Sequence, residues 1–184
     1  MKKHLFLTIL TSFLLISCSG DDPEPVNEEE IITTITVVLS ANGQNNVTLQ
    51  SRDLDGDGPN APIIQVTGGA LATNTTYDGV ITISNETVSP AEDITAEVRQ
   101  EDEEHQFFFQ VSGSLTGSAY SDQDANGNPV GLNFQVTTGA TGPGTLLITL
   151  RHQPDKNAQG VANGDITNAG GETDISQTFN LSVQ

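Results

Sequence analysis

The chain has 184 residues, of which 24 are acidic and only six are lysine or arginine, so its formal charge at neutral pH is −18. Such a surface repels nucleic acid and anionic lipid and attracts cations, which argues against a nucleic-acid-binding protein. The length suits one ordinary domain once an N-terminal signal is removed. With no tryptophan and few aromatic residues, that domain must build its core mainly from isoleucine, valine and leucine.

Residues 1–17 have the features of a bacterial lipoprotein signal peptide. A basic start at Lys2 and Lys3 precedes an apolar run over residues 5–16, and Cys18, the only cysteine, follows a small serine as in the lipobox. The run is too short to span a membrane, which takes ~18 or more apolar residues. We expect cleavage before Cys18 and its lipidation, palmitate included, and the loss of two lysines lowers the formal charge from −18 to −20. The alternative is an ordinary secretory signal with a chance cysteine.

Residues 18–30 are predicted to form an acidic, disordered tether. Low hydrophobicity with dense like charge cannot bury enough surface to fold. The acidic pair Asp21-Asp22, just behind the cysteine, resembles the surface-export signal of Bacteroidetes lipoproteins. This resemblance implies a lipid-anchored protein of the outer membrane that faces the exterior, with the periplasmic face as the alternative.

Residues 31–184 are predicted to form a single β-sandwich domain. Many short alternating strands are separated by polar turns, and Asn42-Gly43 joins the first two strands as a hairpin. The expected strands are Ile31 to Ser40, Val47 to Ser51, Ile63 to Thr67, Thr76 to Asn85, Phe107 to Val111, Leu115 to Ser121, Gly131 to Thr138, Thr145 to His152 and Ile175 to Val183. This pattern favours a mostly β, antiparallel, immunoglobulin-like sandwich. The polar connection over residues 154–171 is long enough to be a functional loop or a mobile one.

One short helix is predicted, with Ser89 as its N-cap. Pro90 suits the first helical position because its missing N–H would have no partner there, and Glu92 completes a Ser-x-x-Glu capping box. Ile94 and Val98 then form a narrow apolar stripe. We expect this helix to lie over one end of the sandwich and to lead into the aromatic strand that follows.

Two histidines are the candidate metal ligands. Alternation along the strands places His105 and His152 on the inward side. His105 opens its strand and His152 closes its own, so antiparallel pairing would bring the two imidazoles together at one end of the sheet. Glu101 and Glu104 would add carboxylates, and Glu101 shares a face with His105 if the helix continues that far. Glu97 is a further candidate.

Two histidines with one or two carboxylates suit Zn²⁺, with Cu²⁺ or another borderline divalent ion as an alternative. The competing interpretation is structural. In it each histidine ends a core strand and hydrogen-bonds to the backbone, while the glutamates form a solvated face.

Two loops have the spacing of calcium ligands. Alternate side-chain oxygens at such a spacing can converge on a hard cation. The residues concerned are Asp53, Asp55 and Asp57 in the first loop and Asp122, Asp124 and Asn126 in the second. Neither loop completes an EF-hand, because Ile64 and Asn133 stand where a bidentate glutamate is needed. The loops are therefore weak structural Ca²⁺ sites or, in the competing interpretation, ordinary Asp-Gly and Asn-Gly turns.

The motifs of catalysis are missing from the sequence. It contains no Gly-x-Ser-x-Gly elbow, no phosphate-binding glycine loop and no His-Glu-x-x-His. The single cysteine is expected to carry lipid, so it cannot act as a nucleophile. We therefore do not expect an enzyme.

Several segments together resemble a group of small flavobacterial lipoproteins, and the resemblance covers most of the mature chain. They are Asp53 to Pro59, Asn85 to Thr95, Glu104 to Phe108, Asp122 to Leu132 and Leu150 to His152. Proteins of this group often carry the label "type 1 periplasmic binding fold superfamily". That label denotes a two-lobed α/β fold of roughly twice this length, whereas this chain has neither the helices nor the βαβ rhythm, so we retain the β-sandwich prediction.

These observations predict an outer-membrane or cell-surface lipoprotein that binds a divalent metal ion, preferably Zn²⁺, with an accessory role beside an outer-membrane transporter as one option. The alternative is a non-enzymatic interaction module for protein or glycan, with a loop stiffened by Ca²⁺. Glycan binding usually needs exposed aromatic platforms, and Tyr77 and Tyr120 are the only tyrosines available. The protein version of the alternative is therefore favoured over the glycan version.

Overall fold

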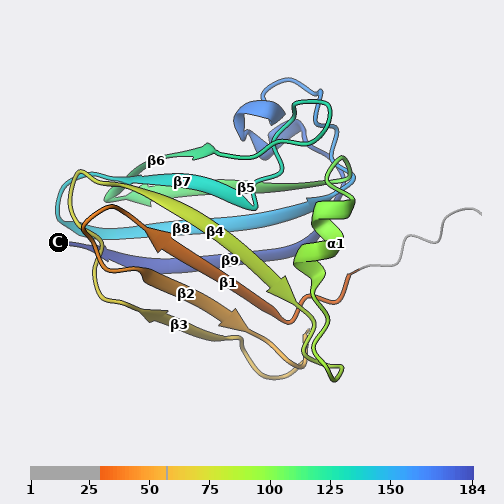
Figure 1. Ribbon diagram of the computed structural model, residues 1–184, viewed down its shortest axis with the longest axis horizontal. Coiled ribbons are helices and arrows are strands. Elements are labelled where there is room, and N and C mark those ends of the chain that lie inside the picture. The colour runs from red at the N-terminus through yellow and green to blue at the C-terminus, as the bar shows by residue number, and fades with distance from the viewer. Residues whose placement is uncertain (1–29, 57) are drawn as a thin grey trace, which may run out of the picture.

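The computed structural model describes residues 30–56 and 58–184 (Figure 1). The predicted signal peptide, Cys18, the tether up to residue 29 and Asp57 lie outside the described residues. The strands are β1 (Thr34–Ser40), β2 (Val47–Arg52), β3 (Ile63–Thr67), β4 (Thr76–Ser84), β5 (His105–Gly113), β6 (Leu115–Tyr120), β7 (Asn133–Thr138), β8 (Gly142–His152) and β9 (Glu172–Val183). The helices are α1 (Ile94–Gln100) and two short 3₁₀ helices, η1 (Val161–Asn163) and η2 (Ile166–Asn168). Within the described ranges, no helix is both long enough and apolar enough to cross a membrane.

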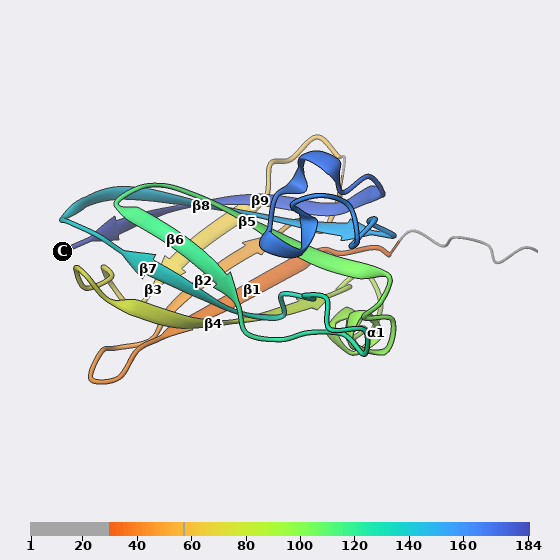
Figure 2. The same cartoon turned by 90° about the horizontal axis from the view of Figure 1, so that it is seen from above.

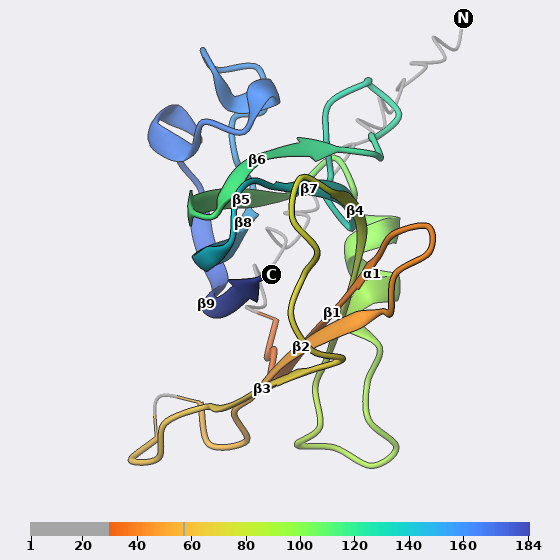
Figure 3. The same cartoon turned by 90° about the vertical axis from the view of Figure 1, so that its left-hand side faces the viewer.

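The strands form two antiparallel sheets that pack as a sandwich. The larger, six-stranded sheet has the order β3-β2-β1-β4-β7-β6, and the smaller, three-stranded sheet has the order β5-β8-β9. In Figure 3 the larger sheet curves from β6 through β4 to β3, with the smaller sheet on its inner side. The predicted antiparallel β-sandwich is thus confirmed. Its division of strands differs from the four against three, or four against five, of immunoglobulin domains, so the narrower immunoglobulin-like assignment is not confirmed.

Alternating apolar residues from both sheets form the core. On β1, Ile35, Val37 and Leu39 are fully buried, and the residues between them are less so, because successive side chains of a strand point to opposite faces. Phe109 of β5 stacks on Phe134 of β7, with ring centroids 4.1 Å apart, and so joins the two sheets. Burying each such side chain contributes roughly 1.5–3 kcal/mol.

Helix α1 begins later than the capping-box motif predicts. Its N-cap is Asp93, whose carboxylate accepts a hydrogen bond from the Ala96 N–H at 3.3 Å. Before it, Asn85 and Glu92 exchange two backbone hydrogen bonds of 3.0 and 3.1 Å. This bridge holds Glu92 in an extended pairing, so the predicted start at Ser89 is wrong.

The predicted apolar stripe of the helix is confirmed, because Ile94 and Val98 are both buried in the core. Thr95 ties the helix to β4: its hydroxyl donates to the Ile83 carbonyl at 3.0 Å and accepts from the Ile83 N–H at 2.8 Å. Helix α1 lies at the end of the sandwich where β4 and β8 end and β5 begins (Figures 1 and 2). The predicted candidate histidines fall at this end.

The long connection between β8 and β9 is folded onto the outer side of β5. Val161 and Ala169 pack on Phe108 in a small second cluster. Lys156 is buried, and its ammonium group donates to the Asp124 carboxylate at 3.0 Å and to the backbone carbonyl of Pro129 at 3.1 Å. Of the two options for this connection, packing of its apolar residues opposes the mobile one.

Candidate functional site

The antiparallel pairing of β5 with β8 places His105 directly opposite His152. The two ring centroids are 4.7 Å apart, and the rings meet edge to face at 68°. His105 is fully buried and His152 is 7% exposed. The predicted juxtaposition of two imidazoles remote in the sequence is therefore confirmed.

The surroundings of His105 favour one tautomer. Its Nδ1 lies 3.1 Å from the backbone carbonyl oxygen of Glu101, and because a carbonyl only accepts hydrogen bonds, Nδ1 must carry a proton to make this bond. In the neutral ring Nε2 then holds the lone pair. A backbone carbonyl on the second nitrogen is the usual way in which proteins orient a histidine that binds metal.

Glu30 faces the other nitrogen of His105. Its Oε1 lies 2.9 Å from His105 Nε2, and its side chain is only 5% exposed. We predicted Glu30 as the last residue of a solvated acidic tether, and the structure corrects this. The glutamate is drawn inside by the imidazole, because a buried carboxylate needs a positive or polar partner.

Asp174 completes the group from β9. The register of β8 with β9 shifts between Leu150 and Arg151, which pair with Ile175 and Thr173, so Asp174 is the extra residue of a β-bulge. Regular alternation back from the inward residues of β9 would have pointed this carboxylate outward. The bulge re-aims it toward the histidines.

Together these four residues form a compact set of potential ligands, which we call the histidine–carboxylate cluster. Glu30, His105, His152 and Asp174 each offer one ligand atom, and those four atoms all lie within 4.8 Å of one another. Three of these residues also have a buried side-chain atom without a hydrogen-bond partner, namely Glu30 Oε2, His152 Nδ1 and Asp174 Oδ2, whereas His105 Nε2 lies 2.9 Å from Glu30 Oε1. An unsatisfied buried polar atom costs roughly 1–3 kcal/mol, so three in one small region call for further partners.

The carboxylates that join the histidines are not the ones predicted. Glu104 lies on the outside: its Oε2 is 4.0 Å from His152 Nε2, accepts a 3.2 Å hydrogen bond from Gln153, and belongs to a half-exposed side chain. Glu101 is the C-cap of α1, and its ligand atom groups with those of Glu30 and Glu97 instead. The helix ends before His105, so the expected shared helical face does not form.

The ionisable groups of the cluster perturb one another. Burial lowers the pKa of His105, but the hydrogen bond and charge of Glu30, the Glu101 carbonyl and the charge of Asp174 outweigh it, so the pKa is raised overall. Burial, followed by the charge of Glu30, raises the pKa of Asp174 to about 6. Burial, with the like charges of Glu30 and Glu101, also raises the pKa of Glu97. Burial and mutual repulsion thus oppose ionisation of Asp174 and Glu97, and a bound cation would offset both effects.

A groove at the surface borders the cluster at Asp174. It has a volume of about 360 Å³ and lies between the segment before β1, the loop after β2 and the start of β9. Asp174 lines this groove together with Ile31, Asp53 and Gln177. Asp174 therefore belongs to both the groove and the cluster, whereas the two histidines do not line the groove.

The two calcium-like loops behave as turns in the described part of the chain. Asp122 accepts hydrogen bonds from the backbone N–H groups of Gly131 and Asn133 at 2.6 and 2.7 Å. Asp124 accepts from two backbone N–H groups of its own loop, at Asn126 and Asn128, and its other oxygen contacts Lys156. The Lys156 ammonium group thus already supplies Asp124 with a positive partner, which favours the turn interpretation, and Ca²⁺ binding at this loop stays a prediction.

The first calcium-like loop is similarly self-bonded. Asp53 accepts from the Asp55 N–H at 3.3 Å, and Asp55 accepts from the Asn60 side chain at 2.7 Å. That hydrogen bond to Asn60 is the main reason why the pKa of Asp55 is lowered. Asp57, the third predicted ligand, lies outside the described residues. These bonds favour the turn interpretation, and Ca²⁺ binding here stays a prediction.

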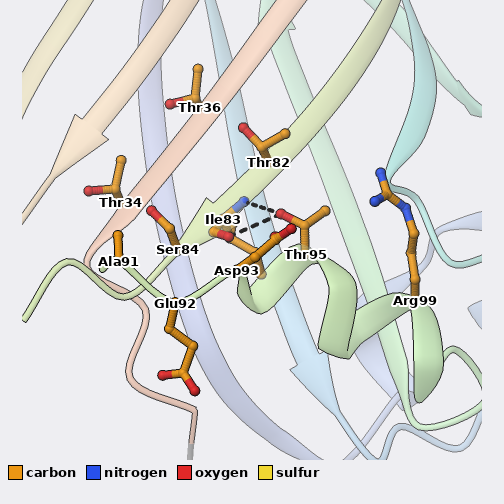
Figure 4. Close-up of a pocket in the computed structure, with 10 residues that line it drawn as sticks. All are labelled: Thr34, Thr36, Thr82, Ile83, Ser84, Ala91, Glu92, Asp93, Thr95 and Arg99. Atoms are coloured by element: carbon orange, nitrogen blue, oxygen red, sulfur yellow. Dashed lines mark hydrogen bonds between the residues drawn. The ribbon is translucent and has the colours of Figure 1, made fainter. Parts of the chain in front are cut away.

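A second groove, of about 320 Å³, lies beside α1 on β1 and β4 (Figure 4). Its walls carry the hydroxyls of Thr34, Thr36 and Thr82. Figure 4 shows Glu92 pointing away from these threonines and Arg99 set apart at the end of the helix. Its polar groups do not converge on one point, so we place the candidate site at the histidine–carboxylate cluster.

Fold and site together define a two-sheet β-sandwich with a buried cluster of two histidines and two carboxylates at one end. The chain matches no protein-family model, no curated protein and no solved structure in comparisons with known proteins. Its function must therefore be argued from the site itself. Two of the cluster's four members, Glu30 and Asp174, were missed from sequence, and only their proximity to a strand end or a bulge could have suggested them.

Proposed function

We propose that this protein binds a divalent metal ion, preferably Zn²⁺, at Glu30, His105, His152 and Asp174. The observation that carries the proposal is that one ligand atom from each of these four residues lies within 4.8 Å of the other three, in a region where three buried polar atoms have no hydrogen-bond partner. One cation can take a ligand from each of the four residues at once. No hydrogen-bond donor of the described chain contacts Glu30 Oε2, His152 Nδ1 or Asp174 Oδ2.

The chemistry of the donor set supports zinc. Two imidazole nitrogens and two carboxylate oxygens make a four-ligand set of the kind that zinc binds tetrahedrally. Imidazole also suits Cu²⁺, whereas Ca²⁺ and Mg²⁺ prefer oxygen ligands alone. A site that includes His105 and His152 is therefore better matched to a borderline transition metal than to a hard cation.

Without metal, the charge of Glu30 is balanced by a proton on His105. Glu30 lies 2.9 Å from His105 Nε2, and the raised pKa of His105 favours an imidazolium there. Metal binding releases that proton, because the ligating nitrogen must give its lone pair to the ion. Affinity should accordingly fall as the pH is lowered.

The cellular setting of the proposal comes from the sequence. A lipid on Cys18 would hold the domain at the outer membrane, and the export-like acidic pair favours the outer surface. A metal-binding domain so placed could pass its ion to an outer-membrane transporter. The strongly negative surface supports cation capture because it raises the local concentration of cations.

Calorimetric titration of Zn²⁺ into the mature, chelator-treated protein tests the proposal. We expect one strong site per chain in the wild type and a loss of at least 100-fold in affinity when His105→Gln and His152→Gln are combined. Glutamine retains polarity, and circular dichroism reports whether the double variant folds. Unchanged zinc affinity in a folded double variant contradicts the proposal.

Two single variants test the proposal even if the histidine double variant does not fold. Asp174→Asn, at a half-buried ligand, should weaken zinc binding by at least tenfold. Glu172→Gln is the matched control, because Glu172 is an exposed acid on the same strand, paired with His152 but outside the cluster. Equal losses in both variants would mean that general surface charge, not ligation, attracts the ion.

One observation favours the alternative, an interaction module. Strand β3 is an edge of the larger sheet, and all five of its residues are exposed. Ile63, Ile64 and Val66 are 61%, 48% and 40% exposed, and the strand carries no charge. Exposed edge strands accept an extended segment of another protein by strand addition. In this version Ca²⁺ stiffens the neighbouring loop at Asp53 and Asp55.

Thermal unfolding separates the two functions. If the module version is right, the melting temperature rises with Ca²⁺ but not with Zn²⁺, and Asp53→Asn combined with Asp55→Asn removes the rise. If the zinc version is right, Zn²⁺ raises the melting temperature and this double variant leaves the rise intact.

A further inference from the structure

We infer that a second cation site adjoins the zinc site and shares Glu30 with it: Glu30, Glu97 and Glu101 together bind a hard divalent cation such as Ca²⁺. The ligand atoms of these three carboxylates lie within 4.8 Å of one another. The inference deepens the proposed function in that Glu30 belongs to both sites, although the second site has its own ligands and its own test.

Glu30 is the reason to expect an ion here rather than a chance meeting of acids. Its side chain is 95% buried, since only 5% is exposed. Oε1 lies 2.9 Å from His105, whereas Oε2 is buried and accepts no hydrogen bond from the described residues. The two oxygens of one carboxylate can bind two neighbouring cations, so the unpartnered oxygen is accounted for.

Helix α1 supplies the other two ligands. Glu97 lies in the first turn and Glu101 is the C-cap, so they stand four residues apart and share one face of the helix. The backbone N–H of Glu101 donates to the Glu97 carbonyl at 2.9 Å, which holds this last turn closed. Like charges at this spacing destabilise a helix, and a cation between them reverses the effect.

The oxygen-only donor set indicates the kind of ion. Three carboxylates without imidazole suit Ca²⁺, which takes six to eight oxygen ligands and can add water for the remainder. Glu97 is exposed and Glu101 is half-buried, so water has access. The two sites would thus bind different kinds of ion, a borderline metal beside the histidines and a hard cation beside the helix.

Calorimetry with Ca²⁺ on the mature, chelator-treated protein tests this inference. We expect Glu97→Gln combined with Glu101→Gln to lower Ca²⁺ affinity at least tenfold and to leave zinc affinity within about threefold. Glu97 is exposed and Glu101 is only half-buried, so the variant should fold. Glu30→Gln should weaken both ions, because both sites use that carboxylate.

Two further double variants make the result decisive. Glu103→Gln with Glu172→Gln removes the same charge from exposed positions outside both groups and should leave Ca²⁺ affinity unchanged. Asp53→Asn with Asp55→Asn should also leave it unchanged. The inference is overturned if Ca²⁺ does not bind at millimolar concentration, if the Glu97 and Glu101 variant binds it as well as the wild type, or if either other double variant abolishes binding. Unchanged zinc affinity in the histidine double variant, together with the expected loss of Ca²⁺ affinity in the Glu97 and Glu101 variant, overturns only the proposed function.

Discussion

Replacing Asp174 by asparagine should make the metal-free protein more stable at neutral pH while weakening its zinc site. Burial and the charge of Glu30 raise the pKa of Asp174 from 3.8 to about 6. A carboxyl whose folded-state pKa is raised contributes fully to stability below about pH 3.8, and that contribution is lost as the pH rises through about 6. At pH 7 the ionised side chain therefore opposes folding, and asparagine removes this penalty.

The size of the effect follows from the shift. Two pKa units correspond to about 3 kcal/mol, and solvent screening of this half-buried group reduces the figure to about 1–2 kcal/mol. For a domain of this size the gain corresponds to a rise of about 2–8 °C in melting temperature. The rise should be present at pH 7 and nearly absent at pH 4.

Thermal unfolding followed by circular dichroism in the presence of a chelator measures the gain. Asp165→Asn is a matched control, because the hydrogen bonds of Thr167 lower the pKa of Asp165 and its substitution should bring no gain. If Asp174→Asn is no more stable than the wild type at pH 7, or gains as much at pH 4, the electrostatic account of the cluster is wrong.

Three further predictions concern the fold around the site. Zinc at 100 times its dissociation constant should stabilise the wild type by about 2.7 kcal/mol, which corresponds to a rise of about 5–11 °C in the melting temperature measured by differential scanning calorimetry. An unchanged melting temperature would count against a zinc site in the folded protein. Lys156→Met leaves Asp124 buried without its cation, so the free energy of unfolding measured in urea should fall by about 3–5 kcal/mol. Adding Asp124→Asn should restore part of that loss. A loss under about 1 kcal/mol would show that the pair is solvated. Gly171→Ala should lower the free energy of unfolding by at least about 2 kcal/mol and weaken zinc binding. The reason is that Gly171 has φ +68° and a Cβ there would lie 2.2 Å from the carbonyl oxygen of His152. An alanine variant as stable as the wild type would refute this close approach.

Regular alternation explains why the strands and the histidine pair were predictable. Strand β3 has the predicted bounds, and the inward phase of β5 and β8 gave His105 and His152 their shared face. Because one histidine begins its strand and the other ends its own, antiparallel pairing of the two strands was enough to predict that the histidines lie together. The metal itself stays a prediction.

The residues that were missed depend on interactions beyond local pattern. Glu30 ends a run of three glutamates, a pattern typical of a solvated segment, and only contact with a histidine distant in the chain buries it. Asp174 points inward because of a bulge, which shifts the phase of β9 by one residue. The predicted capping box before α1 does not form, because Asn85 and Glu92 pair through their backbones instead. Local sequence propensity does not predict such a pairing.

Zinc K-edge X-ray absorption on the zinc-loaded mature protein tests the central claim most directly. The cluster of Glu30, His105, His152 and Asp174 predicts a four-coordinate shell at roughly 2.0–2.2 Å, with the outer-shell scattering of two imidazoles. A shell of oxygen alone, without imidazole scattering, would contradict the claim.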